Sequence, residues 1–173
     1  MEKENVFTIF FRYLILLILG MLIYSAPVLK ALAILTIYPS SFFLSIFYKS
    51  LVHGSNILIN STSIEINSAC VAISAYFLLL VINLTTPMEI KKRFKAILFS
   101  FALFLILNIL RIFIFSILFI NNYAYFDLAH KIFWYGLSTI IVVAIWFLTV
   151  YIFKIKSIPI YSDIRNMLKS ISK

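Results

Sequence analysis

Residues 99–120 read FSFALFLILNILRIFIFSILFI, a stretch that is almost wholly apolar yet carries Asn108 and Arg111 in its second half. About 20 apolar residues in a helix are enough to cross a bilayer. A guanidinium inside such a helix costs about 2.5 to 3.5 kcal/mol on insertion scales, so a charge there usually has a function. Asn108 lies three residues before Arg111 and therefore on the same helical face. The stretch predicts a membrane helix that carries part of a functional site.

The composition of the whole chain is that of a polytopic membrane protein. Of its 173 residues, 64% are hydrophobic and 12% are charged, and the mean hydropathy is +1.08. These values exclude an ordinary soluble domain. The length allows four, or at most five, transmembrane helices. We expect an all-α membrane protein, a small polytopic bundle in which residues 1–173 form a single integral membrane domain.

Apolar runs separated by polar breaks divide the chain into segments. Four runs are predicted transmembrane helices: 6–24, 70–84, 96–120 and 130–153. Residues 28–52 are also apolar, but Pro39 and two lysines interrupt them, so they form either an interfacial or re-entrant helix or a further full span. Isoleucines alternate with other residues on both sides of the polar stretch 60–63, and this period of two predicts a short β-hairpin over 57–67.

Lysine and arginine set the expected orientation in the cell membrane. Four of them lie between Thr85 and Lys95 and five lie in the tail 154–173, whereas none lies in the loop 121–129. Because positive charge accumulates on the cytoplasmic side, we expect the loop 85–95 and the tail to be cytoplasmic and the hairpin to be extracytoplasmic. The net charge of +9 is thereby explained by topology, and we expect no nucleic-acid partner.

This topology brings three reactive side chains to one height. Arg111 follows residue 96 by 15 positions, which at about 1.5 Å per residue puts it roughly 22 Å from the cytoplasmic boundary. Cys70 and His130 begin their helices on the outer side, at a comparable height. The three residues are separated by 41 and 19 positions, so only the predicted topology groups them.

A cysteine, a histidine and an arginine at one level are suited to acyl transfer. The thiolate is the nucleophilic form of cysteine, and His130 could take up the proton of Cys70. Arg111 could hold the oxyanion of a tetrahedral intermediate or clamp a carboxylate or phosphate. As supporting residues, Asp127 could orient the imidazole of His130, and Asn108 could brace Arg111.

Other interpretations of the same residues stay open. A single cysteine in a membrane helix is most often a packing residue, and an intramembrane arginine can pair with a lipid phosphate. The chain could be a non-enzymatic membrane assembly or anionic-lipid-binding protein that uses Arg111. It could also be a lipid-modifying enzyme centred on Arg111 and His130. One cysteine is too few for a disulfide or a cysteine-ligated cluster, so we expect no metal and no cofactor.

In their order along the chain, these residues resemble the exosortase/archaeosortase family of membrane-embedded cysteine transpeptidases. The resemblance covers residues 57–146 and rests on Ala69-Cys70, on Asn108-Ile109-Leu110-Arg111-Ile112, and on His130 followed by Gly136. The chain departs from the family pattern directly after the cysteine. The family often has Ser-Gly there, whereas this sequence has Val71-Ala72.

The resemblance implies a protein-sorting transpeptidase or protease. Such an enzyme cleaves the C-terminal tails of secreted proteins, each made of a signature motif, a hydrophobic helix and a basic cluster, through a thioacyl intermediate. It then passes the acyl group to an acceptor, which we expect to be a membrane lipid. By this resemblance Cys70 is the nucleophile, His130 is the acid/base, and Arg111 stabilises the intermediate or positions the substrate. The active site would lie on the extracytoplasmic side.

Overall fold

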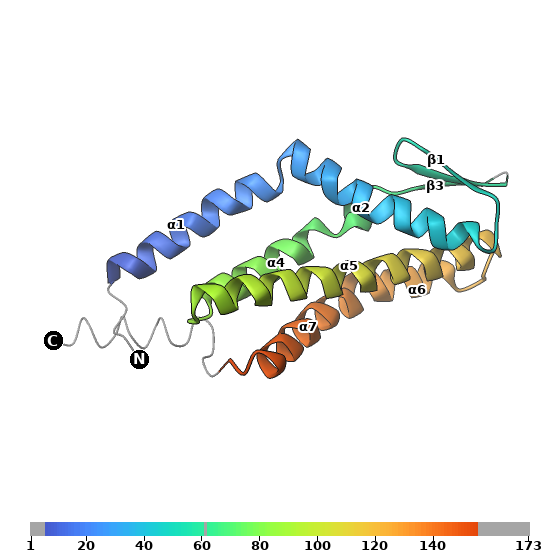
Figure 1. Cartoon of the computed structure of the whole chain (residues 1–173). Coiled ribbons are helices and arrows are strands. Elements are labelled where there is room, and N and C mark those ends of the chain that lie inside the picture. The colour runs from blue at the N-terminus through green and yellow to red at the C-terminus, as the bar shows by residue number, and fades with distance from the viewer. Residues whose placement is uncertain (1–5, 61, 156–173) are drawn as a thin grey trace.

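The computed structural model describes residues 6–60 and 62–155, which form a helical bundle with a small sheet at one end (Figure 1). In chain order the elements are α1 (Val6–Ile23), α2 (Ala26–Ser45), β1 (Ser50–His53), β2 (Asn56–Ile59), β3 (Thr62–Glu65), α3 (Ser68–Val71), α4 (Ile73–Thr85), α5 (Ile90–Ile120), α6 (Phe126–Ile132), the π-helical turn η1 (Phe133–Leu137) and α7 (Ser138–Ile152). The expected predominantly helical fold is confirmed. The predicted tail lies outside the described residues from residue 156 onward.

Four helices in the described ranges are long and apolar enough to cross a membrane. They are α2, the segment Ser68–Thr85, α5, and the continuous helix Phe126–Ile152. Large apolar side chains such as Ile106 and Phe147 are exposed on their outer surfaces. An extended exposed apolar surface is the property expected of helices that face lipid.

The helices α1 and α2 follow one another with a bend between them and do not form an antiparallel pair (Figure 1). Figure 1 shows α2 continuing from the end of α1 towards the sheet. The helix α1 packs on α4, whereas α2 packs on α5 and β1. Pro39 removes the N–H that would donate to Leu35 O, yet α2 continues past it, and hydroxyl groups on either side of the proline bond to carbonyls one turn back. Thr36 Oγ1 donates to Leu32 O at 2.8 Å, and Ser40 Oγ donates to Thr36 O at 2.7 Å.

The small sheet is antiparallel with the strand order β1-β2-β3. The hairpin predicted over 57–67 is confirmed as β2 and β3. The prediction for 28–52 was wrong at its end, because the helix stops at Ser45 and residues 50–53 form β1. Gly54 turns the chain between β1 and β2 with a φ of 62°, which glycine adopts readily.

The sheet is anchored to the helix that carries Arg111. Ile57 and Ile59 of β2 are 0% exposed, and they belong to one buried cluster with Ile112 of α5 and Leu44 of α2. Burying side chains of this size contributes about 1.5 to 3 kcal/mol each. The sheet is therefore a fixed part of the bundle, next to the second half of α5.

Two predicted helix boundaries are shifted towards the N-terminus. The helix α5 begins at Ile90 rather than at residue 96, so Lys91, Lys92 and Arg93 stand on its first turn and not in a loop. The last helix begins at Phe126 rather than at His130. The basic start of α5 and the sheet lie at opposite ends of the bundle (Figure 1).

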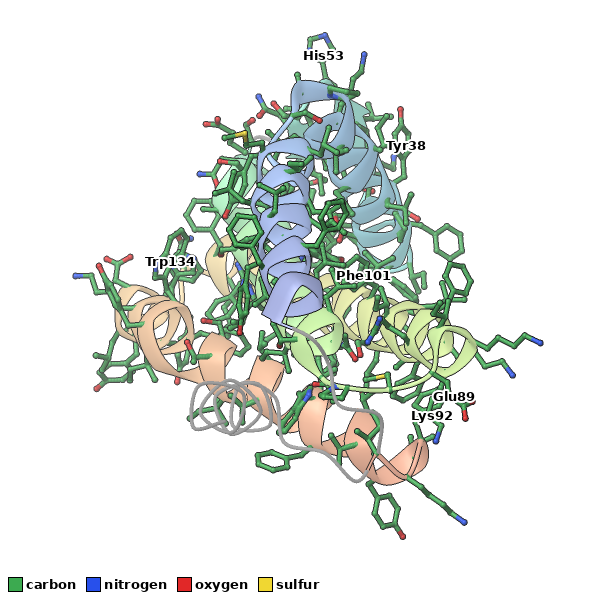
Figure 2. The ribbon with its side chains drawn as sticks, turned by 90° about the vertical axis from the view of Figure 1, so that its left-hand side faces the viewer. Tyr38, His53, Glu89, Lys92, Phe101 and Trp134 are labelled. Carbon is green, nitrogen blue, oxygen red and sulfur yellow. The ribbon has the colours of Figure 1, made fainter. Side chains whose placement is uncertain are left out.

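Away from the sheet, aromatic side chains fill the core between the helices. Tyr76 of α4 is 1% exposed, and its ring meets those of Phe101 and Phe104 edge-on, with centroids 5.2 and 4.8 Å away. Figure 2 shows Phe101 among the helices at the centre of the bundle, whereas Tyr38 and Lys92 lie at its periphery. These contacts hold α4 against α5 in the half of the bundle away from the sheet.

A buried polar cluster joins α4, α5 and α7 in the same half of the bundle. The hydroxyl groups of Ser100 and Thr149 lie 3.0 Å apart, and Asn83 Nδ2 donates to Ser100 Oγ at 3.4 Å. All three residues are 0% exposed. The cluster lies away from the sheet and therefore away from the residues described next.

Candidate functional site

Cys70 stands on a single helical turn that is separated from α4. Asn67 caps this turn, since its Oδ1 accepts hydrogen bonds from the backbone N–H groups of Ala69 and Cys70, both at 3.1 Å. Ala72 ends the turn in the left-handed conformation, with φ 56° and ψ 46°. The predicted helix 70–84 is therefore divided at Ala72. The thiol side chain is half-buried.

Asn108 of α5 fixes the turn that carries the thiol. Its Nδ2 donates to Cys70 O at 3.0 Å and to Val71 O at 3.5 Å, and the residue is 2% exposed. The expected bond from Asn108 to Arg111 is not among the hydrogen bonds of the described residues. The amide is the partner of the cysteine backbone because α3 and the middle of α5 lie side by side at this height.

The guanidinium of Arg111 lies between the cysteine turn and η1. It lines the same pocket as Cys70, and its Cζ lies 5.6 Å from the centroid of the Phe133 ring. Such a distance is within the range of a cation–π interaction. No acidic side chain within residues 6–60 and 62–155 forms a salt bridge with Arg111. The half-buried positive charge is thus available to an anion.

The imidazole of His130 is held by aromatic rings. It stacks on Phe126 with a centroid distance of 5.7 Å and planes 6° apart, and it meets Phe115 edge-on at 5.4 Å. Asp127 does not orient it as expected. Asp127 lies three residues before His130 on the same helix, but it is exposed and forms no hydrogen bond or salt bridge with His130 among the described residues.

Cys70, Arg111 and His130 line one pocket of about 270 Å³. The sheet and α5 supply most of the remaining wall: Ser63, Ile64, Glu65, Ile66, Asn67, Ile112, Phe115, Ser116, Phe119 and Phe126. The predicted convergence of three residues from three segments is therefore present. No hydrogen bond joins the thiol to the imidazole in the described structure, but catalytic hydrogen bonds in free enzymes are often long and shorten when substrate binds.

Arg111 also borders a second pocket, of about 400 Å³, on the other side of the cysteine turn. Ser68, Ser138 and Thr139 contribute hydroxyl groups to its wall, and Trp134 of η1 closes one side. One guanidinium therefore faces two openings. Figure 2 shows His53, the other histidine, pointing outward at the periphery and apart from Trp134.

Several of these residues were not singled out in the sequence. Asn67 could have been recognised, because an asparagine directly before a helix is a frequent N-cap. The aromatic residues around His130 could not, since phenylalanine is abundant throughout the chain. Among the described residues no group of three histidine, cysteine or acidic side chains could hold a metal ion.

Comparison with family models, with curated proteins and with solved structures returned no match. The functional interpretation therefore rests on the geometry of the pocket and on the chemistry of its residues.

Proposed function

We propose that the protein is a membrane-embedded sorting transpeptidase or protease that uses Cys70 as its nucleophile. The observation that carries this proposal is the single pocket lined by Cys70, Arg111 and His130. A thiol, an imidazole and a guanidinium can supply the nucleophile, the acid/base and the oxyanion-binding group of acyl transfer. The substrates would be secreted proteins with a C-terminal signature motif, a hydrophobic helix and a basic cluster.

In the first half of the reaction, His130 takes the proton of the Cys70 thiol. The sulfur attacks the carbonyl carbon of the scissile peptide bond, and the carbonyl oxygen becomes an oxyanion beside Arg111. Collapse of this tetrahedral intermediate breaks the C–N bond. The departing amine takes the proton from His130, and the acyl group remains on Cys70 as a thioester.

In the second half, a hydroxyl group of the acceptor attacks the thioester carbon. His130 takes the hydroxyl proton, and Arg111 again faces the oxyanion. Collapse of this second intermediate breaks the C–S bond, and the thiolate recovers the proton from His130. A lipid alcohol gives the lipid-linked product, and water gives simple hydrolysis.

The position of the pocket supports an extracytoplasmic reaction. It lies beside the sheet, at the end of the bundle opposite to the basic first turn of α5. If basic residues stay on the cytoplasmic side, the pocket opens towards the side where secreted proteins emerge. A helical bundle of this kind also leaves a lipid-facing flank on which the hydrophobic helix of a substrate can rest.

The test is a mass-spectrometric comparison of envelope proteins from cells that carry the native protein or the Cys70→Ala, His130→Ala or His53→Ala variant. A defined set of secreted proteins should keep its hydrophobic C-terminal tail with Cys70→Ala and His130→Ala. His53→Ala is the matched control, because His53 is exposed and lies outside the pocket. Identical tails in all four proteomes would contradict the proposal.

A second candidate function, binding of anionic lipid without catalysis, is favoured by the larger pocket beside Arg111. A guanidinium with several hydroxyl groups around it suits a phosphate headgroup. In that case Cys70→Ala should be silent, while Arg111→Ala should abolish binding to vesicles that contain anionic lipid. Retained turnover of a lipid with Cys70→Ala would instead favour a lipid-modifying enzyme that uses Arg111 and His130.

A further inference from the structure

The strand β3 lies at one edge of the sheet, and its backbone bonding pattern can be worked out. Ile66 N donates to Ser55 O at 2.9 Å, so these two residues form a hydrogen-bonded pair. Hydrogen-bonded and non-bonded pairs alternate along an antiparallel ladder. In the register of β2 and β3, the next bonded pair is Ile57 with Ile64. The N–H and C=O groups of Ser63 and Glu65 therefore point away from β2.

This free edge forms a wall of the pocket that contains Cys70. Five consecutive residues, 63–67, line that pocket. A pocket lying over one face of a strand would be lined by alternate residues, because successive side chains point to opposite faces. Within β3 the lining residues Ser63, Ile64 and Glu65 are consecutive, which is the pattern expected of a pocket along the strand edge, where backbone groups are exposed.

The two edges of the sheet are treated differently by the rest of the fold. The strand β1 packs against α2, and Ser50 Oγ donates to Ser41 O at 2.9 Å. No backbone hydrogen bond outside the sheet is found for Ser63 or Glu65 in the described part of the chain. Unpaired strand edges attract a further strand, and proteins usually cover them. Here the uncovered edge is the one beside the thiol.

We propose that the free edge of β3 binds an extended segment of the polypeptide that Cys70 cleaves, as an added strand of the sheet. The inference rests on the proposed function and adds the binding mode of its substrate. An extended peptide carries backbone N–H and C=O groups that match those of Ser63 and Glu65. A lipid chain has no such groups, and a helix has already paired its own.

The pairing also directs the bound segment towards the thiol. After Glu65 the chain continues along the same wall of the pocket through Asn67 to Cys70. A strand bound along β3 therefore extends towards the thiol. Backbone pairing at Ser63 and Glu65 holds the segment extended beside the pocket without reading its side chains, and contacts of the signature motif then set which bond reaches Cys70. A set of substrates with one short motif and varied flanking sequence can therefore share the site.

The experiment compares proline substitutions at the two edges of the sheet. Glu65→Pro removes the N–H that points into the pocket and leaves the bonds to β2 in place. Val52→Pro is the matched control, because the register of β1 and β2 directs its N–H away from β2 at the covered edge. The measured quantity is the fraction of secreted precursors that keep their tails, as in the Cys70→Ala comparison.

Glu65→Pro should raise the fraction of tailed precursors by about tenfold over Glu65→Ala, which keeps the N–H. Val52→Pro should process precursors at the native level. The rate of Cys70 alkylation by N-ethylmaleimide should be the same in Glu65→Pro and in the native protein, which separates lost pairing from a displaced thiol. If Glu65→Pro processes precursors normally while Cys70→Ala accumulates tailed precursors, the strand pairing is overturned and the proposed function is not. Absence of tails with Cys70→Ala overturns the pairing and the proposed function together.

Disulfide trapping decides the case in which Glu65→Pro fails to fold or alters Cys70 alkylation. Cys70→Ala removes the single cysteine of the chain, and Ser63→Cys then supplies one at the strand edge. The probe is a tailed precursor from the Cys70→Ala proteome with single cysteines at consecutive positions around its signature motif. Cross-links at alternate positions are expected of a paired strand. Cross-links at every third or fourth position, or at none, overturn the proposal.

Discussion

The side-chain amide of Asn108 donates a hydrogen bond of 3.0 Å to the backbone carbonyl oxygen of Cys70. The helix that carries Arg111 therefore also holds the turn that carries the thiol. This bond crosses 38 positions of sequence, and it couples the placement of the nucleophile to that of the guanidinium.

Replacing Asn108 with leucine should loosen the cysteine turn. The change leaves the Cys70 carbonyl without its donor, which costs about 1 to 3 kcal/mol in a buried setting. Thermal unfolding in lipid nanodiscs measures this loss, and tail retention in the envelope proteome measures processing. Ser100→Ala is the control, because it removes a buried hydrogen bond from the same helix away from the site. Loss of processing in both variants would show that any weakening of α5 is sufficient.

Replacing Ala72 with glycine should stabilise the protein by about 1 kcal/mol. Ala72 holds a φ of 56°, and the left-handed conformation disfavours a residue with a Cβ atom. The midpoint of thermal unfolding checks the prediction, with Ala75→Gly in α4 as a control that should destabilise the helix. A lower midpoint for Ala72→Gly would contradict the assigned backbone conformation.

Arg111→Lys should process substrates about 10²- to 10³-fold more slowly than the native protein. Lysine keeps the charge but has neither the planar fork of donors nor the flat group that lies 5.6 Å from the Phe133 ring. The rate of tail removal after pulse labelling measures the effect. Native rates with Arg111→Lys would mean that a point charge suffices, and native rates with Arg111→Ala would remove Arg111 from the reaction.

Phe126→Leu should lower the processing rate by about tenfold, whereas Asp127→Asn should leave it unchanged. The ring of Phe126 stacks on the imidazole of His130 and fixes its plane, and the exposed Asp127 does not contact it. General acid–base catalysis contributes about 10²- to 10⁴-fold to the rate, and a misoriented imidazole loses part of that contribution. The reverse outcome, with Asp127→Asn impaired and Phe126→Leu normal, would restore the acidic residue as the orienting group.

Much of the fold followed from the sequence because hydrophobic runs are long and turn signals are distinct. The helices over 6–24, 96–120 and 130–153 were predicted, with a start six residues late for α5 and four residues late for the last helix, and the β2–β3 hairpin was predicted within two residues. The strand β1 was missed, because the aromatic run before it has no break that separates helix from strand. Its half-buried and exposed residues alternate only in the folded chain.

The candidate site was predicted in its residues but not in its contacts. Orientation rules placed Cys70, Arg111 and His130 at one height, and the structure places them around one pocket. The partners of Asn108 and His130 were not predictable, because they depend on how helices rotate about their axes. The position of β3 along the pocket was not predictable either, because it depends on the strand order and the register of the sheet.

The most direct measurement of the central claim is the intact mass of the purified protein in nanodiscs after incubation with a tailed precursor. The account predicts an adduct on Cys70 whose mass is that of the precursor without its tail, released by hydroxylamine as a thioester should be. The Cys70→Ala variant should form no adduct and leave the precursor whole. Tail removal by Cys70→Ala, with no adduct on the native protein, would contradict the account.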